Sequence, residues 1–201
     1  MRKNKYNIVQ TGQLALWLMS RFLVVYVLKV EAERVEIKKT TRARIVISNH
    51  VSIFDPFMFV GLLSWKEMTY INPIRAIIAK EYYYSAILPL AYLAGCFPTK
   101  PLIRSVAKYA GTEAAIRYGK NGSTIGIYPE GKRSPDAHTP AKYGVIKIID
   151  GLDFPDIYLC NIVRTGKNNR NYKVTIVQNN AIGTIKDPQK IMHEVYSLGI
   201  Q

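Results

Sequence analysis

The 201 residues of the chain suit one domain with a single sizeable core. Hydrophobic residues make up 48% of the chain and charged residues 21%, which excludes an intrinsically disordered protein. The 28 Lys and Arg residues against 14 Asp and Glu give a formal net charge of +14. This excess predicts an anionic partner, which can be nucleic acid, an anionic membrane or a phosphorylated substrate.

Residues 1–32 are expected to form an N-terminal helix that associates with a membrane. Residues 1–44 hold ten basic and three acidic residues and also the apolar run Leu14–Leu28. Basic charge beside an apolar segment favours a membrane surface over nucleic acid. Fifteen helical residues span about 22 Å, less than the roughly 30 Å of a hydrocarbon core, and Arg21 lies near the centre of the run.

These limits predict a helix that is partly sunk into one leaflet, with Lys3, Lys5 and Lys29 near the head groups. The protein would then be peripheral or monotopic on the cytoplasmic face of the cell membrane. Polar and amphipathic residues recur at helical spacing, namely Gln10, Gln13, Trp17 and Ser20/Arg21. This stripe also suits a helix packed on the protein's own core, and a short tilted span remains open.

From residue 33 to residue 201, short β-rich runs alternate with segments of helical periodicity, which predicts one α/β domain. We expect a mixed, mostly parallel sheet covered by helices. The expected strands are Val35–Lys38, Arg44–Ser48, Ile74–Ala79, Thr124–Tyr128, Ile157–Val163 and Tyr172–Val177. The expected helices are Pro56–Trp65, Glu81–Leu93, Leu102–Tyr118, Ala141–Asp150 and Pro188–Leu198.

The two cysteines, Cys96 and Cys160, form no C-x-x-C pair and lie in apolar surroundings. They are expected to be small core residues, and neither a metal site nor a redox motif is predicted.

A first candidate motif, ISNHVSIFDP, occupies residues 47–56 and brings His50 to the end of an expected strand. Asp55 reads as a helix cap and Pro56 as the first helical residue. A turn between strand and helix can fold the Asp55 carboxylate back onto the His50 imidazole. The carboxylate would then fix the tautomer and stabilise the imidazolium. Taken alone, the motif also fits a surface histidine beside an ordinary helix cap.

A second candidate motif, IGIYPEGKRS, occupies residues 125–134, where a strand runs into a Pro-Glu-Gly turn. Gly131 permits a backbone conformation that other residues avoid. Lys132 and Arg133 follow on the same short turn, and an arginine can bind a phosphate through two parallel hydrogen bonds. Alone, this segment is equally typical of a solvated turn.

Together, N-H-x-S-x-x-D and the later Y-P-E-G-K-R-S resemble the motifs of the glycerolipid acyltransferase family, over roughly residues 45–165. The resemblance implies that His50 is the general base and that Asp55 orients it. A third family segment falls at residues 95–101, where Pro101 stands in place of the family's arginine, so Lys100 or Arg104 is expected to supply the cation. The full substrate-binding set that we expect is Asn49, Ser52, Lys100, Arg104, Glu130, Gly131, Lys132 and Arg133.

The resemblance further implies an O-acyltransferase of phospholipid biosynthesis that acylates lysophosphatidate. The acyl donor would be a thioester of coenzyme A or of acyl carrier protein, and no cofactor is expected. A related enzyme that uses another lysolipid or a glycolipid is the first alternative. A second is a membrane- or nucleic-acid-binding module without catalysis. The net charge and 14 tyrosines permit nucleic-acid binding, but the chain has no aromatic-rich K/R-G-F-x-F strand, so no nucleic-acid partner is expected.

Overall fold

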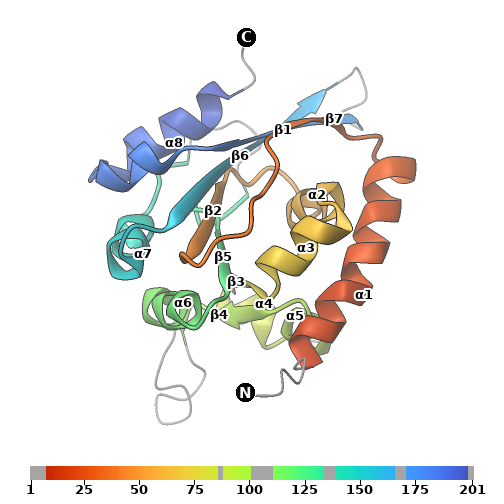
Figure 1. The fold of residues 1–201 in the computed structure, drawn as a ribbon, viewed down its shortest axis with the longest axis horizontal. Coiled ribbons are helices and arrows are strands. Elements are labelled where there is room, and N and C mark those ends of the chain that lie inside the picture. The colour runs from red at the N-terminus through yellow and green to blue at the C-terminus, as the bar shows by residue number, and fades with distance from the viewer. Residues whose placement is uncertain (1–7, 86–87, 101–110, 134–138, 166–170, 199–201) are drawn as a thin grey trace.

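The computed structural model describes residues 8–85, 88–100, 111–133, 139–165 and 171–198. Within this part of the chain, a seven-stranded sheet has the order β1-β7-β6-β2-β5-β3-β4 (Figure 1). Only β6 and β7 pair antiparallel, and the other neighbouring strands are parallel. The expected mixed, mostly parallel sheet is therefore confirmed. The strands are β1 (Glu31–Arg34), β2 (Arg44–Ser48), β3 (Ile74–Ile78), β4 (Cys96–Pro98), β5 (Thr124–Ile127), β6 (Asp156–Thr165) and β7 (Asn171–Gln178).

Helices cover both faces of this sheet (Figure 1). On one face lie α1 (Ile8–Phe22), its π-helical continuation η1 (Leu23–Val27), α2 (Asp55–Leu62) and α3 (Trp65–Ile71). On the other lie α6 (Gly111–Lys120), α7 (Gly144–Leu152) and α8 (Pro188–Ser197). The short elements are α4 (Lys80–Tyr83), α5 (Leu88–Leu93) and the 3₁₀ turn η2 (Asn180–Thr184).

The alternation of side chains along the strands builds two separate cores. On β2, Ile45 and Ile47 pack with α6, α7 and α8, whereas Val46 packs with α1, α2 and α3. All three side chains are buried because a strand between two helical layers has no solvent-facing side. Cys160 of β6 is also a buried core residue, as expected, while Cys96 on the edge strand β4 is only partly buried.

The expected strand at Val35–Lys38 is wrong, because the strand ends at Arg34 and begins four residues earlier than expected. After β1 the chain leaves the sheet so that Ile37 can be buried beside α3. Glu67 of α3 fixes this exit, since its Oε1 accepts the Ile37 main-chain N–H at 2.9 Å and pairs with Arg34 at 2.6 Å. Ile37 is therefore buried as part of a loop and not as part of a strand.

The expected single helix Pro56–Trp65 is in fact two helices, α2 and α3, that are separated at Leu63 and Ser64. Ser64 begins α3 with a capping box, in which its hydroxyl accepts the Glu67 N–H and Glu67 accepts the Ser64 N–H. The expected helix over residues 81–93 is likewise two short helices, α4 and α5. Strand β4 was not expected, and residues 101–110 of the expected helix 102–118 lie outside the described residues.

The polar stripe of the N-terminal helix faces the protein. Gln13 is buried, and its amide donates to the carbonyl oxygens of Ile74 and Ala94 at 2.5 and 2.8 Å. The indole N–H of Trp17 donates to the carbonyl oxygen of Leu63 at 3.0 Å. The helix also lies so close to α2 that a Cβ atom on Gly61 would come within 2.5 Å of the Ser20 carbonyl oxygen. The stripe is therefore a packing surface of the domain.

The opposite side of the same helix is apolar and exposed. Its exposed side chains are Ile8, Leu18, Met19, Phe22, Val25, Tyr26 and Val27. The helical segment extends from Ile8 to Val27, which is longer than the apolar run in the sequence suggests. By length and composition alone, these 20 residues are the one described helix that is long and apolar enough to cross a membrane.

Candidate active site

Two neighbouring strands bring the two sequence motifs to the same edge of the sheet. Strands β2 and β5 are parallel, with Ile47 aligned to Ile127. The residues that follow both strands therefore leave at the carboxyl-terminal edge, which is where open α/β sheets bind their ligands. His50 comes two residues after β2, and Tyr128 comes directly after β5.

Asp55 contacts the His50 side chain and the main chain of the turn between them. The Oδ2 atom of Asp55 lies 2.7 Å from Nδ1 of His50. The same oxygen accepts the main-chain N–H groups of Val51 at 2.8 Å and Ser52 at 2.9 Å. Asp55 is completely buried and is the first residue of α2, and the cap is Phe54, so the helix begins one residue earlier than expected. The carboxylate therefore points back to the imidazole and does not cap its own helix.

The remaining side of the imidazole faces a cleft. The His50 ring stacks on the Tyr128 ring, with centroids 4.3 Å apart and planes inclined by 23°. Burial, followed by the charge of Asp55, raises the pKa of Tyr128 well above its usual value, so this stacking partner stays neutral. Because Nδ1 faces the carboxylate, Nε2 is the ring nitrogen that can take a proton from a substrate.

Glu130, in the turn after β5, binds the main chain of His50. The side chain is completely buried, and its Oε2 accepts the His50 main-chain N–H at 3.0 Å. Its Oε1 accepts a hydrogen bond from the hydroxyl of Tyr196 on α8. Burial raises the pKa of Glu130 to about 7, the bond from His50 partly opposes this rise, and the charge of Asp55 adds to it. Both carboxylate oxygens are thus used by protein donors.

Residues of strand β6 also bind the turn that carries His50. Asn49 is buried and makes two bonds of 2.8 Å with the main chain of Ile162, one as donor and one as acceptor. Arg164 donates to the carbonyl oxygen of Val51 at 2.8 Å. Together with the Asp55 contacts, these bonds hold the histidine turn in one conformation.

A cleft of about 670 Å³ opens in front of His50 and carries three cations, Lys132, Arg133 and Lys142. Gly131 has a φ of +68°, which reverses the chain after Glu130. The Lys142 side chain lies against Gly131, where a Cβ atom would collide with it. Sequence reasoning missed Lys142 because the expected helix 141–150 included it, whereas α7 begins at Gly144.

The lining of the cleft also includes apolar side chains. The carboxyl end of β3 and the following helix contribute Ile77, Ile78, Ala79 and Tyr82, and Val145 lines the wall from α7. One cleft therefore contains cationic side chains, apolar side chains and the imidazole of His50. This combination matches a substrate that joins an anionic group to a hydrocarbon chain.

The structure brings only part of the expected substrate-binding set to the cleft. Gly131, Lys132 and Arg133 line it beside His50. Asn49 and Glu130 lie in the scaffold beneath the turn, and the buried Ser52 accepts the Phe54 N–H at 3.2 Å through its hydroxyl. The expected cation Lys100 is exposed but not part of the cleft lining, and Arg104 lies outside the described residues.

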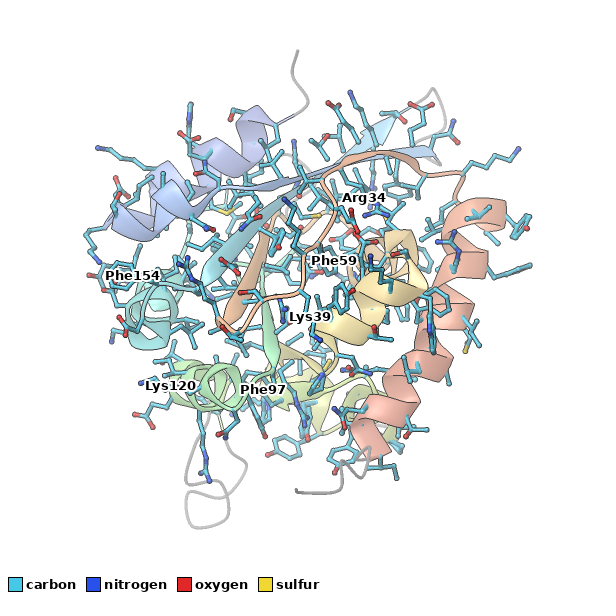
Figure 2. The ribbon with its side chains drawn as sticks, in the orientation of Figure 1. Arg34, Lys39, Phe59, Phe97, Lys120 and Phe154 are labelled. Atoms are coloured by element: carbon cyan, nitrogen blue, oxygen red, sulfur yellow. The ribbon has the colours of Figure 1, made fainter. Side chains whose placement is uncertain are left out.

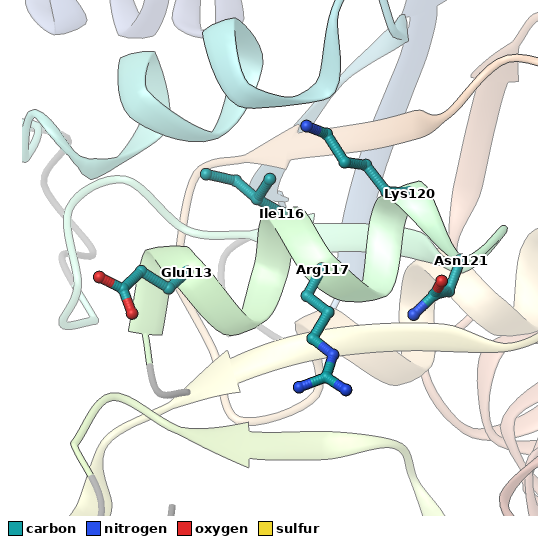
Figure 3. Close-up of a pocket in the computed structure, with 5 residues that line it drawn as sticks. All are labelled: Glu113, Ile116, Arg117, Lys120 and Asn121. Carbon is teal, nitrogen blue, oxygen red and sulfur yellow. The ribbon is translucent and has the colours of Figure 1, made fainter. Parts of the chain in front are cut away.

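A second depression of about 530 Å³ lies on α6, among Glu113, Ile116, Arg117, Lys120 and Asn121 (Figure 3). Figure 3 shows that these side chains point in different directions and do not converge on one point. It contains no residue of either motif, so the cleft at His50 is the candidate active site.

The imidazole of His50, oriented by a buried carboxylate, thus lies at the strand ends of an α/β sheet and in one cleft with three cations. The model of the Acyltransferase family matches residues 28–163, and the chain belongs to this family. It is therefore an acyltransferase enzyme.

The fold is similar to the crystal structure of the 1-acyl-sn-glycerophosphate (LPA) acyltransferase PlsC from Thermotoga maritima, with a TM-score of 0.63. The sequences are 17% identical, and the match covers 99% of this chain and 82% of that one. No curated protein sequence matches the chain.

Proposed function

We propose that this acyltransferase moves a fatty acyl group from a thioester donor to the free hydroxyl of lysophosphatidate and forms phosphatidate. The observation that carries the proposal is the cleft that holds the His50–Asp55 pair and three cations together. The similarity of the fold to an LPA acyltransferase adds support.

The proposed reaction is a direct transfer without an acylated protein residue. Nε2 of His50 removes the proton from the acceptor hydroxyl while the hydroxyl oxygen attacks the thioester carbonyl carbon. The new C–O bond forms, and the carbonyl electrons move to the oxygen of a tetrahedral intermediate. Its collapse breaks the C–S bond, and the imidazolium returns the proton to the departing thiolate. Asp55 stabilises the imidazolium between these steps.

The three cations that line the cleft form the proposed binding site for the acceptor phosphate. Lys132 and Arg133 are exposed, and no ion pair joins either of them to a carboxylate within the described ranges. Lys142 lies beside them. An arginine with two parallel N–H groups and two lysines suits a phosphate monoester, which carries up to two negative charges.

The proposed site of action is an anionic membrane surface on the cytoplasmic side, where the protein would be peripheral or monotopic. The exposed apolar side of α1 and η1 would enter the bilayer, and the net charge of +14 would attract anionic head groups. The catalytic turn itself carries two exposed apolar side chains, Ile53 (63% exposed) and Phe54 (38% exposed). Apolar groups at this position favour a catalytic turn that faces lipid.

An acceptor panel tests the proposal directly. Purified protein in anionic vesicles is assayed with one acceptor at a time, namely lysophosphatidate, another lysophospholipid, a lyso-ornithine lipid or a glycolipid. Each acceptor is tested with acyl-CoA and with an acyl carrier protein thioester as donor. We expect phosphatidate formation to be fastest, and to be lost in the His50→Ala variant. Faster acylation of an uncharged acceptor would contradict the lysophosphatidate assignment. Absence of transfer from either donor to every acceptor would reject the proposed function.

A further inference from the structure

The C-terminal helix α8 contacts the catalytic scaffold although it lies outside residues 28–163, which match the family model. Its residue Tyr196 donates a hydrogen bond from its hydroxyl to Oε1 of Glu130. We propose that Tyr196 is a positioning residue that holds the Glu130 carboxyl and, through it, the main chain of His50. The catalytic consequence rests on the proposed role of His50 as the general base.

The chain of contacts is short and involves three separate elements. The hydroxyl of Tyr196 comes from α8, the carboxyl of Glu130 from the turn after β5, and the main-chain N–H of His50 from the end of β2. The two oxygens of Glu130 each accept one of these donors, with the His50 N–H at 3.0 Å. Glu130 is completely buried, so water does not replace either donor without a rearrangement.

Strand β6 fixes the end of α8 that carries Tyr196. The amide of Asn161 donates to the carbonyl oxygens of Tyr196 at 3.4 Å and Leu198 at 2.6 Å. One face of α8 is buried in the core through Ile191, Met192 and Val195. Because the main chain is held at this end, the Tyr196 ring has a defined direction toward Glu130.

A phenol is suited to this position because its oxygen both donates and accepts. Toward an ionised Glu130 the hydroxyl donates, and toward a protonated Glu130 it accepts the carboxyl proton. A pKa of about 7 means that both forms of Glu130 are populated near neutral pH. The other hydrogen-bond partner of this carboxyl, the main-chain N–H of His50, can only donate. Tyr196 thus keeps Glu130 in place in both states.

The Tyr196→Phe substitution isolates the hydroxyl because the ring and its packing are kept. Without the hydroxyl, Oε1 of Glu130 is a buried polar atom without its donor, and the carboxyl is expected to rotate. The His50 N–H then loses a firm acceptor, and the imidazole departs from its productive geometry. We expect kcat to fall by about 3- to 30-fold. The KM values for acceptor and donor should stay within about 2-fold, because Tyr196 does not line the cleft.

A double-mutant cycle separates this role from general packing. If the hydroxyl acts through Glu130, Tyr196→Phe should lower kcat no further in a Glu130→Ala background. Tyr92→Phe, at an exposed tyrosine of α5, removes a hydroxyl elsewhere and should leave kcat unchanged. An unchanged kcat in Tyr196→Phe, or multiplicative effects of the two substitutions, would overturn the proposal.

Amide hydrogen exchange at His50 tests the structural link without any substrate. Exchange of the His50 N–H should be at least about 10-fold faster in Tyr196→Phe than in the wild type, and Tyr92→Phe should match the wild type. Equal exchange in all three proteins would refute the positioning role. If exchange responds but no acyl transfer occurs with any substrate, the proposed function fails and the Tyr196 link stands.

Discussion

The Nδ1 atom of His50 lies 2.7 Å from Oδ2 of Asp55, and this oxygen also accepts the main-chain N–H groups of Val51 and Ser52. One buried carboxylate oxygen therefore orients the imidazole and shapes the turn that presents it. The two effects are coupled, because any change at Asp55 alters both the charge next to the ring and the path of the chain.

Asp55→Asn should lower kcat by about 10²–10⁴-fold with a smaller effect on KM, because the neutral amide no longer stabilises the imidazolium. Steady-state kinetics with the preferred acceptor measure this change. Asp153→Asn is the matched control, since Asp153 is exposed and has a positive φ that asparagine tolerates. A kcat for Asp55→Asn within about 3-fold of the wild type would remove the carboxylate from the mechanism.

Arg133→Ala should raise the KM for lysophosphatidate by about 10-fold or more and leave kcat less affected, because a charge-assisted pair with the phosphate is lost. Lys120→Ala removes one positive charge from the exposed surface of α6 and serves as the control. Equal KM values in wild type and Arg133→Ala would show that the phosphate binds elsewhere.

Gly131→Ala should cost about 1–2 kcal/mol of stability because φ is +68° at this position. It should also raise the KM for lysophosphatidate, because the new methyl group displaces the Lys142 side chain. Gly122→Ala is a matched control, as Gly122 has a φ of +87° and nothing lies within 4 Å of the position that its new methyl group would take. If both variants lose stability but neither changes KM, Lys142 has no part in phosphate binding.

Glu130 should make the protein less stable as the pH rises from about 4.5 to about 7. Its pKa is raised to about 7 in the folded protein from 4.5, so the folded state binds more protons in this interval. The stability contributed by the protonated form is fully present below 4.5 and is lost as the pH passes 7. Between pH 5 and pH 8, the wild type should therefore lose roughly 1–3 kcal/mol more than Glu130→Gln in denaturant unfolding. Parallel losses in the two proteins would contradict the raised pKa.

Phe22→Ser should weaken binding to anionic vesicles by about 10-fold or more, because Phe22 is 61% exposed on the apolar side of α1. Phe154→Ser is the control, since Phe154 is 84% exposed at a distant part of the fold (Figure 2). Vesicle flotation at several lipid concentrations gives both partition constants. Identical losses of vesicle affinity in the two variants would indicate nonspecific hydrophobic adsorption and not a membrane-binding face on α1.

The sequence allowed much of the site to be predicted, because its contacts lie within short segments. The approach of Asp55 to His50 follows from a turn of five residues, and the alignment of β2 with β5 follows from two strands that end in motifs. The direction of the Glu130 side chain could not be predicted. Its partner Tyr196 lies 66 residues away on α8. Helical periodicity shows which face of a helix is buried, but not which group a tyrosine hydroxyl on that helix binds.

The wrong predictions of helices and strands also arose where local sequence does not specify the structure. The sequence Ser64-Trp65-Lys66-Glu67 is a capping-box pattern that indicates the start of α3, but the apolar run before it made one long helix seem continuous. Val35–Lys38 has the composition of a strand, yet β1 pairs with β7 through the four residues before it, three of which are charged. Pairing at a sheet edge depends on the neighbouring strand, which local composition does not specify.

The inward orientation of the polar residues on α1 has a practical consequence for anyone who wishes to purify this enzyme. Gln13 binds the main chain of Ile74, the first residue of β3, and the last two residues of this strand line the cleft. Gln13 also donates to the carbonyl oxygen of Ala94, which follows α5. A shortened chain without its first helix would leave these groups unpaired and would uncover the apolar side of α2. The protein is therefore best purified with α1 in place.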